Sequence, residues 1–264
     1  NGMFAIAILD QRSNELFLVR DRLGVKPLYF GEHQGRLLFG SEIKALLAGG
    51  MSARASPAAL DQFLTFNYVP LPLTAFAGIH HVMPGHYLRI TRESFEQVRW
   101  WNIADIQPES GRSEAEWIDE FLVTLDDAVR IRLRADVPFG AFLSGGVDSS
   151  TIVGLMARHV DLPIKTFCIG FKDPRFDESE FALAAAQRFG TEHTSERVEV
   201  DIQATWPKAM WHCDQPHGDA SFMPTLRVSE LAARHVKVVL TGDGGDELFA
   251  GYDKYRDFFR RSEA

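Results

Sequence analysis

The pattern of apolar and polar positions divides the 264-residue chain into two parts of different texture. Up to about residue 107, short apolar runs such as ELFLVRD and HYLRI are separated by turn sequences, which predicts strands and hairpins. Two short helices are expected to interrupt these strands. Ser41 would cap a helix over SEIKALLAGG, while Ser56 and Pro57 would begin another over SPAALDQFLTF.

From about residue 108, apolar strands alternate with helical patterns. Ser113 and Glu116 have the spacing of a capping box at the start of a long helix. The strands that follow read VPFGAFL, IKTFCIGF, SERVEV and VKVVLT, with helical segments between them. Such alternation predicts a parallel sheet with helices on both faces. We therefore expect two domains, residues 1–107 and residues 108–264.

Two of these strands end in loops rich in glycine and aspartate. SGGVDSS follows the strand that ends at Leu143, and GDGGDE follows the strand that ends at Thr241. Ligands of open parallel sheets bind beyond the carboxyl ends of the strands. We therefore expect both loops to face one crevice.

The composition of SGGVDSS fits a phosphate site that includes a metal ion. Gly145 and Gly146 allow a tight turn and a close approach of the backbone, and Ser149 and Ser150 begin a helix whose free N–H groups favour an anion. Asp148 would repel a phosphate group unless Mg²⁺ lies between them. The alternative is an ordinary strand-to-helix turn with Asp and Ser as caps. The loop has neither the lysine of a P-loop nor a Gly-x-Gly-x-x-Gly pattern.

The second loop supplies further carboxylates from Asp243, Asp246 and Glu247. On its own it would fit an acidic turn or a calcium loop, although the EF-hand spacing is absent. Two acidic, glycine-rich loops at the same edge of one sheet favour a shared Mg²⁺ and phosphate site over two unrelated turns.

Composition narrows the class of protein. A net charge of −8 and a pI near 5.6 argue against non-specific nucleic-acid binding and against a polybasic membrane surface. No apolar run approaches the roughly 20 residues of a membrane-spanning helix. Two cysteines, Cys168 and Cys213, are too few for a disulfide scaffold or a zinc site, which fits a reducing cytoplasm.

Longer segments resemble one known family in order along the chain. RADVPFGAFLSGGVDSS, IKTFCIGF, DESEFALAAAQRFGTEH and LTGDGGDELFAGYDKY resemble the synthetase domain, an ATP pyrophosphatase, of glutamine-dependent asparagine synthetases. Upstream, NGMFAIAILD, VRDRLGVKPLYF, FGSEIKALL and GIHHVMPGHYL resemble the later part of that family's glutaminase domain. The implied fold is α/β and α+β: a strand-rich, partial N-terminal-nucleophile (Ntn) domain, then a doubly wound parallel sheet, truncated at both ends.

The resemblance implies an activity, with ATP and Mg²⁺ as cofactors. L-Aspartate is amidated through β-aspartyl-AMP, AMP and pyrophosphate are released, and nitrogen comes from glutamine or ammonia. The expected partners are these small molecules, with no nucleic acid and no membrane, and with a homodimer as a candidate assembly.

The resemblance also assigns roles to residues of the two loops. It implies that Asp148 and Asp246 bind Mg²⁺. Asp243 matches the catalytic acidic position tied to forming the acyl-adenylate, where many members carry Glu. The positions that match pyrophosphate donors are Ser144, Gly145, Gly146, Ser149 and Ser150, and those that match AMP contacts are Leu143, Ile169, Thr241 and Gly242.

The absence of one residue bears on the glutaminase part of this interpretation. The family's glutaminase uses an N-terminal cysteine, whereas the chain begins with Asn1, and neither Cys168 nor Cys213 has a matching position. We therefore interpret the chain as an internal fragment and expect it not to hydrolyse glutamine by itself.

The loops leave the carboxylate acceptor open. A related amidotransferase or a ring-closing ligase of the β-lactam synthetase kind, acting on another acceptor, is the first alternative. A nucleotide-binding relic without ligase activity is the second. The presence of Asp148, Asp243 and Asp246 argues against the relic.

Overall fold

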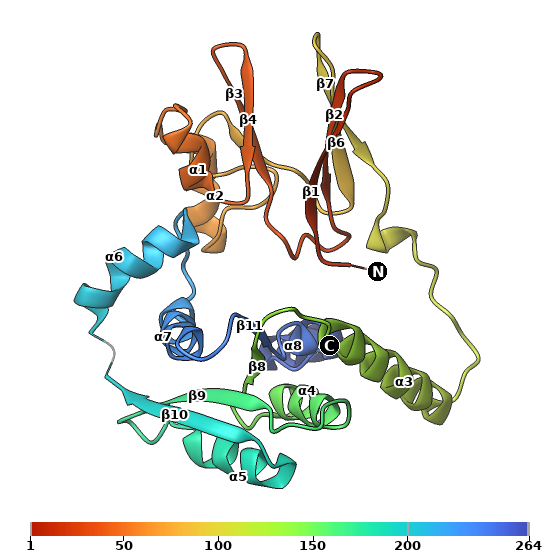
Figure 1. Cartoon of the computed structure of the whole chain (residues 1–264), viewed down its shortest axis with the longest axis vertical. Coiled ribbons are helices and arrows are strands. Elements are labelled where there is room, and N and C mark those ends of the chain that lie inside the picture. The colour runs from red at the N-terminus through yellow and green to blue at the C-terminus, as the bar shows by residue number, and fades with distance from the viewer. Residues whose placement is uncertain (1, 200, 263–264) are drawn as a thin grey trace. The chain divides into compact units, whose positions relative to one another are not determined.

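The structure is a computed structural model that describes residues 2–199 and 201–262, and its contacts divide the chain into two compact units (Figure 1). The first unit contains Asn1–Ser110 and also Gln203–Ala220, and the second contains Gly111–Ile202 and Ser221–Ala264. The sequence did not indicate that residues 203–220 would join the first unit. The domain boundary expected after residue 107 stays a prediction.

The first unit is built on two antiparallel sheets. One has the order β1-β2-β6-β7, formed by Ala5–Asp10, Glu15–Arg20, His86–Ile90 and Phe95–Arg99. The other has the order β4-β3-β5, formed by Arg36–Gly40, Tyr29–His33 and Ile79–His81. The helices of this unit are α1 (Ile43–Ala48), α2 (Pro57–Phe66) and α6 (Ile202–Cys213), and the short 3₁₀ helix η1 spans Ile103–Asp105. The fully buried Leu18, Val82 and Leu88 form one core cluster.

The starts of α1 and α2 differ in the origin of their caps. The Ala59 N–H donates to Ser56 Oγ and Pro57 is the first residue of α2, as predicted. The predicted cap of α1 by Ser41 is wrong. This helix begins at Ile43, whose N–H donates to the Asp214 carboxylate at 2.6 Å. The cap therefore comes from a residue 171 positions away, which no local pattern shows.

The second unit contains the predicted parallel sheet, in the order β10-β9-β8-β11. Its strands are β8 (Phe139–Phe142), β9 (Lys165–Phe171), β10 (Glu192–Val198) and β11 (Val238–Leu240). Four of the seven residues of β9 are buried and none is exposed, as is typical of a parallel strand covered on both faces.

Helices cover both faces of this sheet, which confirms the predicted fold class (Figure 1). α4 (Val147–Ala157) and α5 (Ser179–Phe189) pack on one face, around the buried Val153, Met156, Ala182 and Ala186. α7 (Phe222–Ala233) packs on the other face, where Leu231 contacts Phe167 in the core cluster. The remaining helices are α3 (Glu114–Arg132), which has the predicted capping box, α8 (Gly245–Phe249) and α9 (Asp253–Ser262).

The strand order places a switch point between β8 and β11. From β8 the chain adds β9 and then β10 on one side, and returns to add β11 on the other side. In open parallel sheets the crevice for a ligand lies where the order reverses, beyond the carboxyl ends of the strands. The loops that follow β8 and β11 lie at this point.

Candidate functional site

The two predicted loops are in direct contact at the switch point. A Cβ atom built on Gly242 would lie 2.8 Å from the backbone nitrogen of Ser149. One built on Gly245 would lie 2.6 Å from the carboxylate of Asp148. Glycine at 242 and 245 therefore lets the loop after β11 lie directly against the start of α4.

The start of α4 offers N–H groups to a ligand. The helix begins at Val147, two residues earlier than the predicted start at Ser149, and Gly146 is its N-cap in an extended conformation. Because Gly146 has no side chain, no cap oxygen covers the first N–H groups of the helix. These groups and the positive end of the helix dipole favour an anion.

The serine hydroxyls of the first loop have different environments. Ser144 Oγ lies 2.9 Å from Ser149 Oγ, and the Gly146 N–H donates to Ser144 Oγ at 3.3 Å. The Ser150 hydroxyl is buried and finds no hydrogen-bond partner among the described residues. Ser144 and Ser149 thus form a small network at the open start of the helix.

Gly145 is required for a reason other than ligand approach. Its φ of +86° lies in the left-handed region, and a Cβ there would lie 2.4 Å from the carbonyl carbon of Phe181. The loop after β8 is therefore packed against the first turn of α5. A Cβ built on Gly146 would meet only Ser144 Oγ, at 3.4 Å, so the space beside Gly146 is open.

The loop after β11 holds its acidic side chains in distinct ways. Thr241 Oγ1 donates to Asp243 Oδ2 at 2.8 Å, and Asp243 is exposed. The Tyr252 hydroxyl donates to Glu247 at 2.7 Å, which lowers the pKa of Glu247 and raises the pKa of Tyr252 to about 12. Asp246, half-buried, follows Gly245 directly in α8.

The carboxylates fit a magnesium ion that arrives with a phosphate ligand. Residues 2–199 and 201–262 contain no group of three or more His, Cys, Asp or Glu side chains suited to hold a metal alone. Mg²⁺, however, is commonly bound by one or two carboxylates together with phosphate oxygens and water. Asp148 is in contact with Gly245, the neighbour of Asp246, so these two carboxylates belong to adjoining segments.

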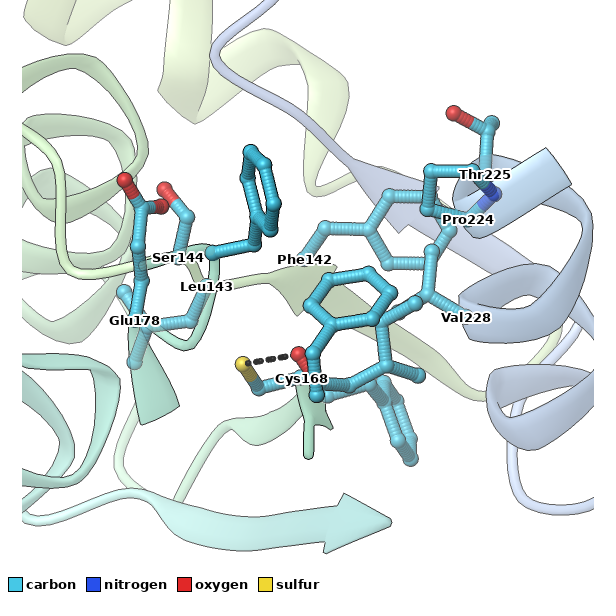
Figure 2. A pocket seen from close by; sticks show the side chains of 12 residues that line it. Phe142, Leu143, Ser144, Cys168, Glu178, Pro224, Thr225 and Val228 are labelled. Carbon is cyan, nitrogen blue, oxygen red and sulfur yellow. Dashed lines mark hydrogen bonds between the residues drawn. The ribbon is translucent and has the colours of Figure 1, made fainter. Parts of the chain in front are cut away.

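A cavity of about 210 Å³ opens beside the first loop (Figure 2). Leu143, Ser144 and Ile169, three residues that the sequence assigned to a nucleotide site, lie in its wall. The sequence did not indicate the other wall residues, which are Phe142, Phe167, Cys168, Phe171, Phe176, Glu178, Pro224, Thr225 and Val228. The one sequence feature that could have identified them is that several of them lie at the end of β8 or β9.

Neither cysteine has the properties of a nucleophile. Burial raises the pKa of the Cys168 thiol to about 11, and the charges of Asp177 and Glu178 act in the same direction. Burial also raises the pKa of Cys213. Reactive cysteines have lowered pKa values, so both thiols are expected to be inert.

The first unit has a cavity of its own, of about 300 Å³, with His81 and Cys213 in its wall. His81 is 6% exposed, and neither of its ring nitrogens finds a hydrogen-bond partner within the described part of the chain. Burial, together with the charge of Arg20, lowers the pKa of His81 to about 4. This side chain is a neutral imidazole at neutral pH.

Comparisons with family models match the two parts of the chain separately. The asparagine synthase model matches residues 120–264, and a glutamine amidotransferase domain model matches residues 1–101. No helix among the described residues has both the length and the apolar character needed to cross a bilayer.

Individual relatives match this chain over nearly its whole length. Asparagine synthetase (glutamine-hydrolyzing) 1 of Bacillus subtilis is 35% identical over 97% of this chain and 40% of its own length. Amidase chyE of Penicillium rubens is 37% identical over the same shares. An NH3-dependent NAD synthetase from Campylobacter jejuni aligns at 17% identity and a TM-score of 0.36, covering 51% of this chain and 60% of that one. The chain spans about half or less of the length of its curated relatives.

Proposed function

Because this chain belongs to the asparagine synthase family, we propose that its second unit binds Mg·ATP and serves the ATP-dependent amidation of L-aspartate. The contact of Gly242 and Gly245 with Asp148 and Ser149 carries this proposal. That contact brings together the start of a helix, which is suited to an anion, and a loop rich in carboxylates, so that both belong to a single site.

The proposed reaction has two steps. A carboxylate oxygen of aspartate attacks the α-phosphorus of ATP, the bond to the bridging oxygen breaks, and pyrophosphate leaves with that electron pair. Ammonia derived from glutamine then attacks the acyl carbon of β-aspartyl-AMP, AMP leaves, and the nitrogen loses a proton to give the amide. The first step makes the carboxylate oxygen part of a good leaving group.

The residues of the first loop would stabilise the departing pyrophosphate. The N–H groups at the start of α4 and the hydroxyls of Ser144 and Ser149 are preorganised donors for the charge that develops on it. Asp148 and Asp246 would hold Mg²⁺, which when bound supplies positive charge to the phosphate oxygens. Leu143 and Ile169, in the cavity wall, would contact the nucleoside.

Asp243 and its neighbours would act on the α-phosphate side. Thr241 Oγ1 donates to Asp243 Oδ2, which fixes that carboxylate beside Gly242. We propose Asp243 as the acidic group tied to formation of the acyl-adenylate, and Thr241 and Gly242 as contacts of AMP.

Calorimetric titration of the chain with Mg·ATP tests the site. We expect measurable binding that falls at least tenfold in Asp148→Asn, because the metal loses a charged ligand. Asp161→Asn, which changes an exposed aspartate after α4, is the matched control and should bind like the wild type. Unchanged affinity in Asp148→Asn would reject the metal assignment and favour the relic, and the absence of binding to the wild type would reject the proposed nucleotide site.

One comparison favours a second candidate reaction, in which a carboxylate other than that of aspartate is the acceptor. A relative named as an amidase is as similar to this chain as relatives named as asparagine synthetases. Pyrophosphate release by the complete protein, measured with L-aspartate and with other carboxylates and followed by mass analysis of the product, separates these cases. Asparagine together with AMP would support the first acceptor, and release that does not depend on aspartate would support another.

A further inference from the structure

The cavity beside the first loop has an apolar end and a polar end. Figure 2 shows Phe142, Pro224 and Val228 together on one side of it. Ser144 and Glu178 lie next to each other on the opposite side. Glu178 is the one charged residue among the twelve residues that line this cavity.

The carboxylate of Glu178 has no role in the fold that the structure records. The neighbouring Asp177 accepts the Ser179 N–H at 3.1 Å and pairs with Arg197. Glu178 contributes its backbone oxygen to the first turn of α5, but its carboxylate makes no hydrogen bond or ion pair with any described residue. An exposed carboxylate is usually only solvated, but this one lies in a cavity wall.

A carboxylate repels a phosphate group, so Glu178 is better suited to a neutral donor of the ligand, such as a sugar hydroxyl. Ser144 belongs to the network at the start of α4, so it marks the phosphate end of the site. The apolar end fits a base, and in a nucleotide the ribose lies between base and phosphate. Glu178 lies beside Ser144 at the polar end of the cavity, where the sugar of a nucleotide would meet its phosphates.

We propose that Glu178 accepts hydrogen bonds from the ribose hydroxyls and selects a ribonucleotide over a 2′-deoxyribonucleotide, an inference that rests on the nucleotide site proposed above. An ionised carboxylate only accepts hydrogen bonds, and hydroxyls can donate them. Acidic side chains bind the ribose of dinucleotides in the same way in other parallel-sheet folds.

The test compares the binding of AMP and 2′-deoxy-AMP to the chain by calorimetry. Metal is left out, so that Asp148 and Asp246 do not enter the comparison. We expect the wild type to bind AMP about tenfold more tightly than 2′-deoxy-AMP, because a hydrogen bond to a charged group is lost in the deoxynucleotide. In Glu178→Ala this ratio should fall to about one.

Two further variants separate the role of the carboxylate from the stability of the helix. Glu180→Ala, in the first turn of α5 but outside the cavity wall, should keep the ratio of the wild type. Glu178→Gln keeps the size of the side chain and should fall between wild type and Glu178→Ala. Circular dichroism checks that each variant is folded.

The remaining outcomes overturn the inference in distinguishable ways. A ratio near ten in both Glu178 variants would show that another group recognises the hydroxyl. Loss of discrimination between AMP and IMP, with the 2′-hydroxyl preference intact, would place Glu178 at the base. Failure of the wild type to bind either AMP or Mg·ATP would reject the proposed nucleotide site itself, and this inference with it.

Discussion

At the residue scale, Gly245 and Asp148 are the contact on which the site depends. The backbone of Gly245 is outside the left-handed region, so alanine fits the local conformation, but its Cβ would lie 2.6 Å from the Asp148 carboxylate. We expect Gly245→Ala to displace this carboxylate and to weaken binding of Mg·ATP about tenfold, measured by calorimetric titration.

A double-mutant cycle gives the control for this prediction. If Gly245→Ala acts through the carboxylate, it should have little further effect in a chain that already carries Asp148→Ala. Equal losses in both backgrounds would show that the methyl group disturbs the loop by another route.

His81 makes the stability of the first unit sensitive to pH. Its pKa is about 4 in the folded chain against 6.5 in the unfolded chain, so the unfolded state binds more protons between these values. Stability present above pH 6.5 is therefore lost as the pH falls toward 4. Between pH 7 and pH 5 we expect a loss of about 2 kcal/mol from this group, visible in urea unfolding curves.

The matched variant for the pH prediction is His81→Gln, which does not titrate. Its unfolding free energy should fall by less than that of the wild type over the same interval. Parallel pH dependence in both proteins would mean that other groups cause the loss.

At the element scale, the start of α1 depends on one buried carboxylate. Asp214 accepts the Ile43 N–H and also pairs with Lys44 at 2.6 Å, and its side chain is 7% exposed. Burial alone would lower the pKa of Lys44, but the hydrogen bond and charge of Asp214 raise it overall. We expect Asp214→Asn to lower the unfolding free energy by about 3 kcal/mol, since Lys44 loses its buried partner.

Glu42 supplies the comparison. It lies 3.4 Å from the same lysine nitrogen, but its side chain is 57% exposed. We expect Glu42→Gln to cost less than about 1 kcal/mol in the same unfolding measurement. If the two variants lose the same stability, the burial of the Asp214–Lys44 pair is not the cause.

Elements whose signals are local were predictable from the sequence. The cap of α2 and the capping box of α3 are formed by residues three apart, and both are confirmed. The cap of α1 is not local, because Asp214 lies 171 residues from Ile43. A pattern in a short window cannot report a contact made only by folding.

The sequence predicted the two loops of the candidate site but not the wall of its cavity. The two loops were found because glycine and aspartate follow buried strands, and the strand order brings them together. The cavity wall was missed because Phe142, Phe167 and Phe171 have the pattern of an ordinary core in the sequence. The sequence identified Gly145 but attributed it to a tight turn and ligand approach. In the structure, glycine is needed there because the loop packs against α5.

At the scale of the whole molecule, the division of the chain in space differs from its division in sequence. Residues 203–220 lie within the stretch matched by the asparagine synthase model, yet they belong to the first unit. Gln215 accepts the Ala75 N–H at 3.1 Å, and the Gly218 N–H donates to the Asn67 carbonyl at 2.8 Å. Together with the Asp214 cap, these contacts make the segment a structural part of the first unit.

This division predicts that residues 1–110 lose stability when they are separated from residues 203–220. The fragment lacks the carboxylate that caps α1 and the partners of Ala75 and Asn67, so we expect weak near-ultraviolet dichroism and a lower urea midpoint than in the chain. Joining residues 203–220 to the end of this fragment through a flexible linker should recover the urea midpoint.

The control is the same joined fragment with Gly218→Ala, in which the new Cβ would lie 2.6 Å from Asn67 Cβ. Its urea midpoint should recover less than that of the joined fragment with Gly218. If residues 1–110 alone unfold at the same urea midpoint as the joined fragment, residues 203–220 do not stabilise the first unit, and the prediction is wrong.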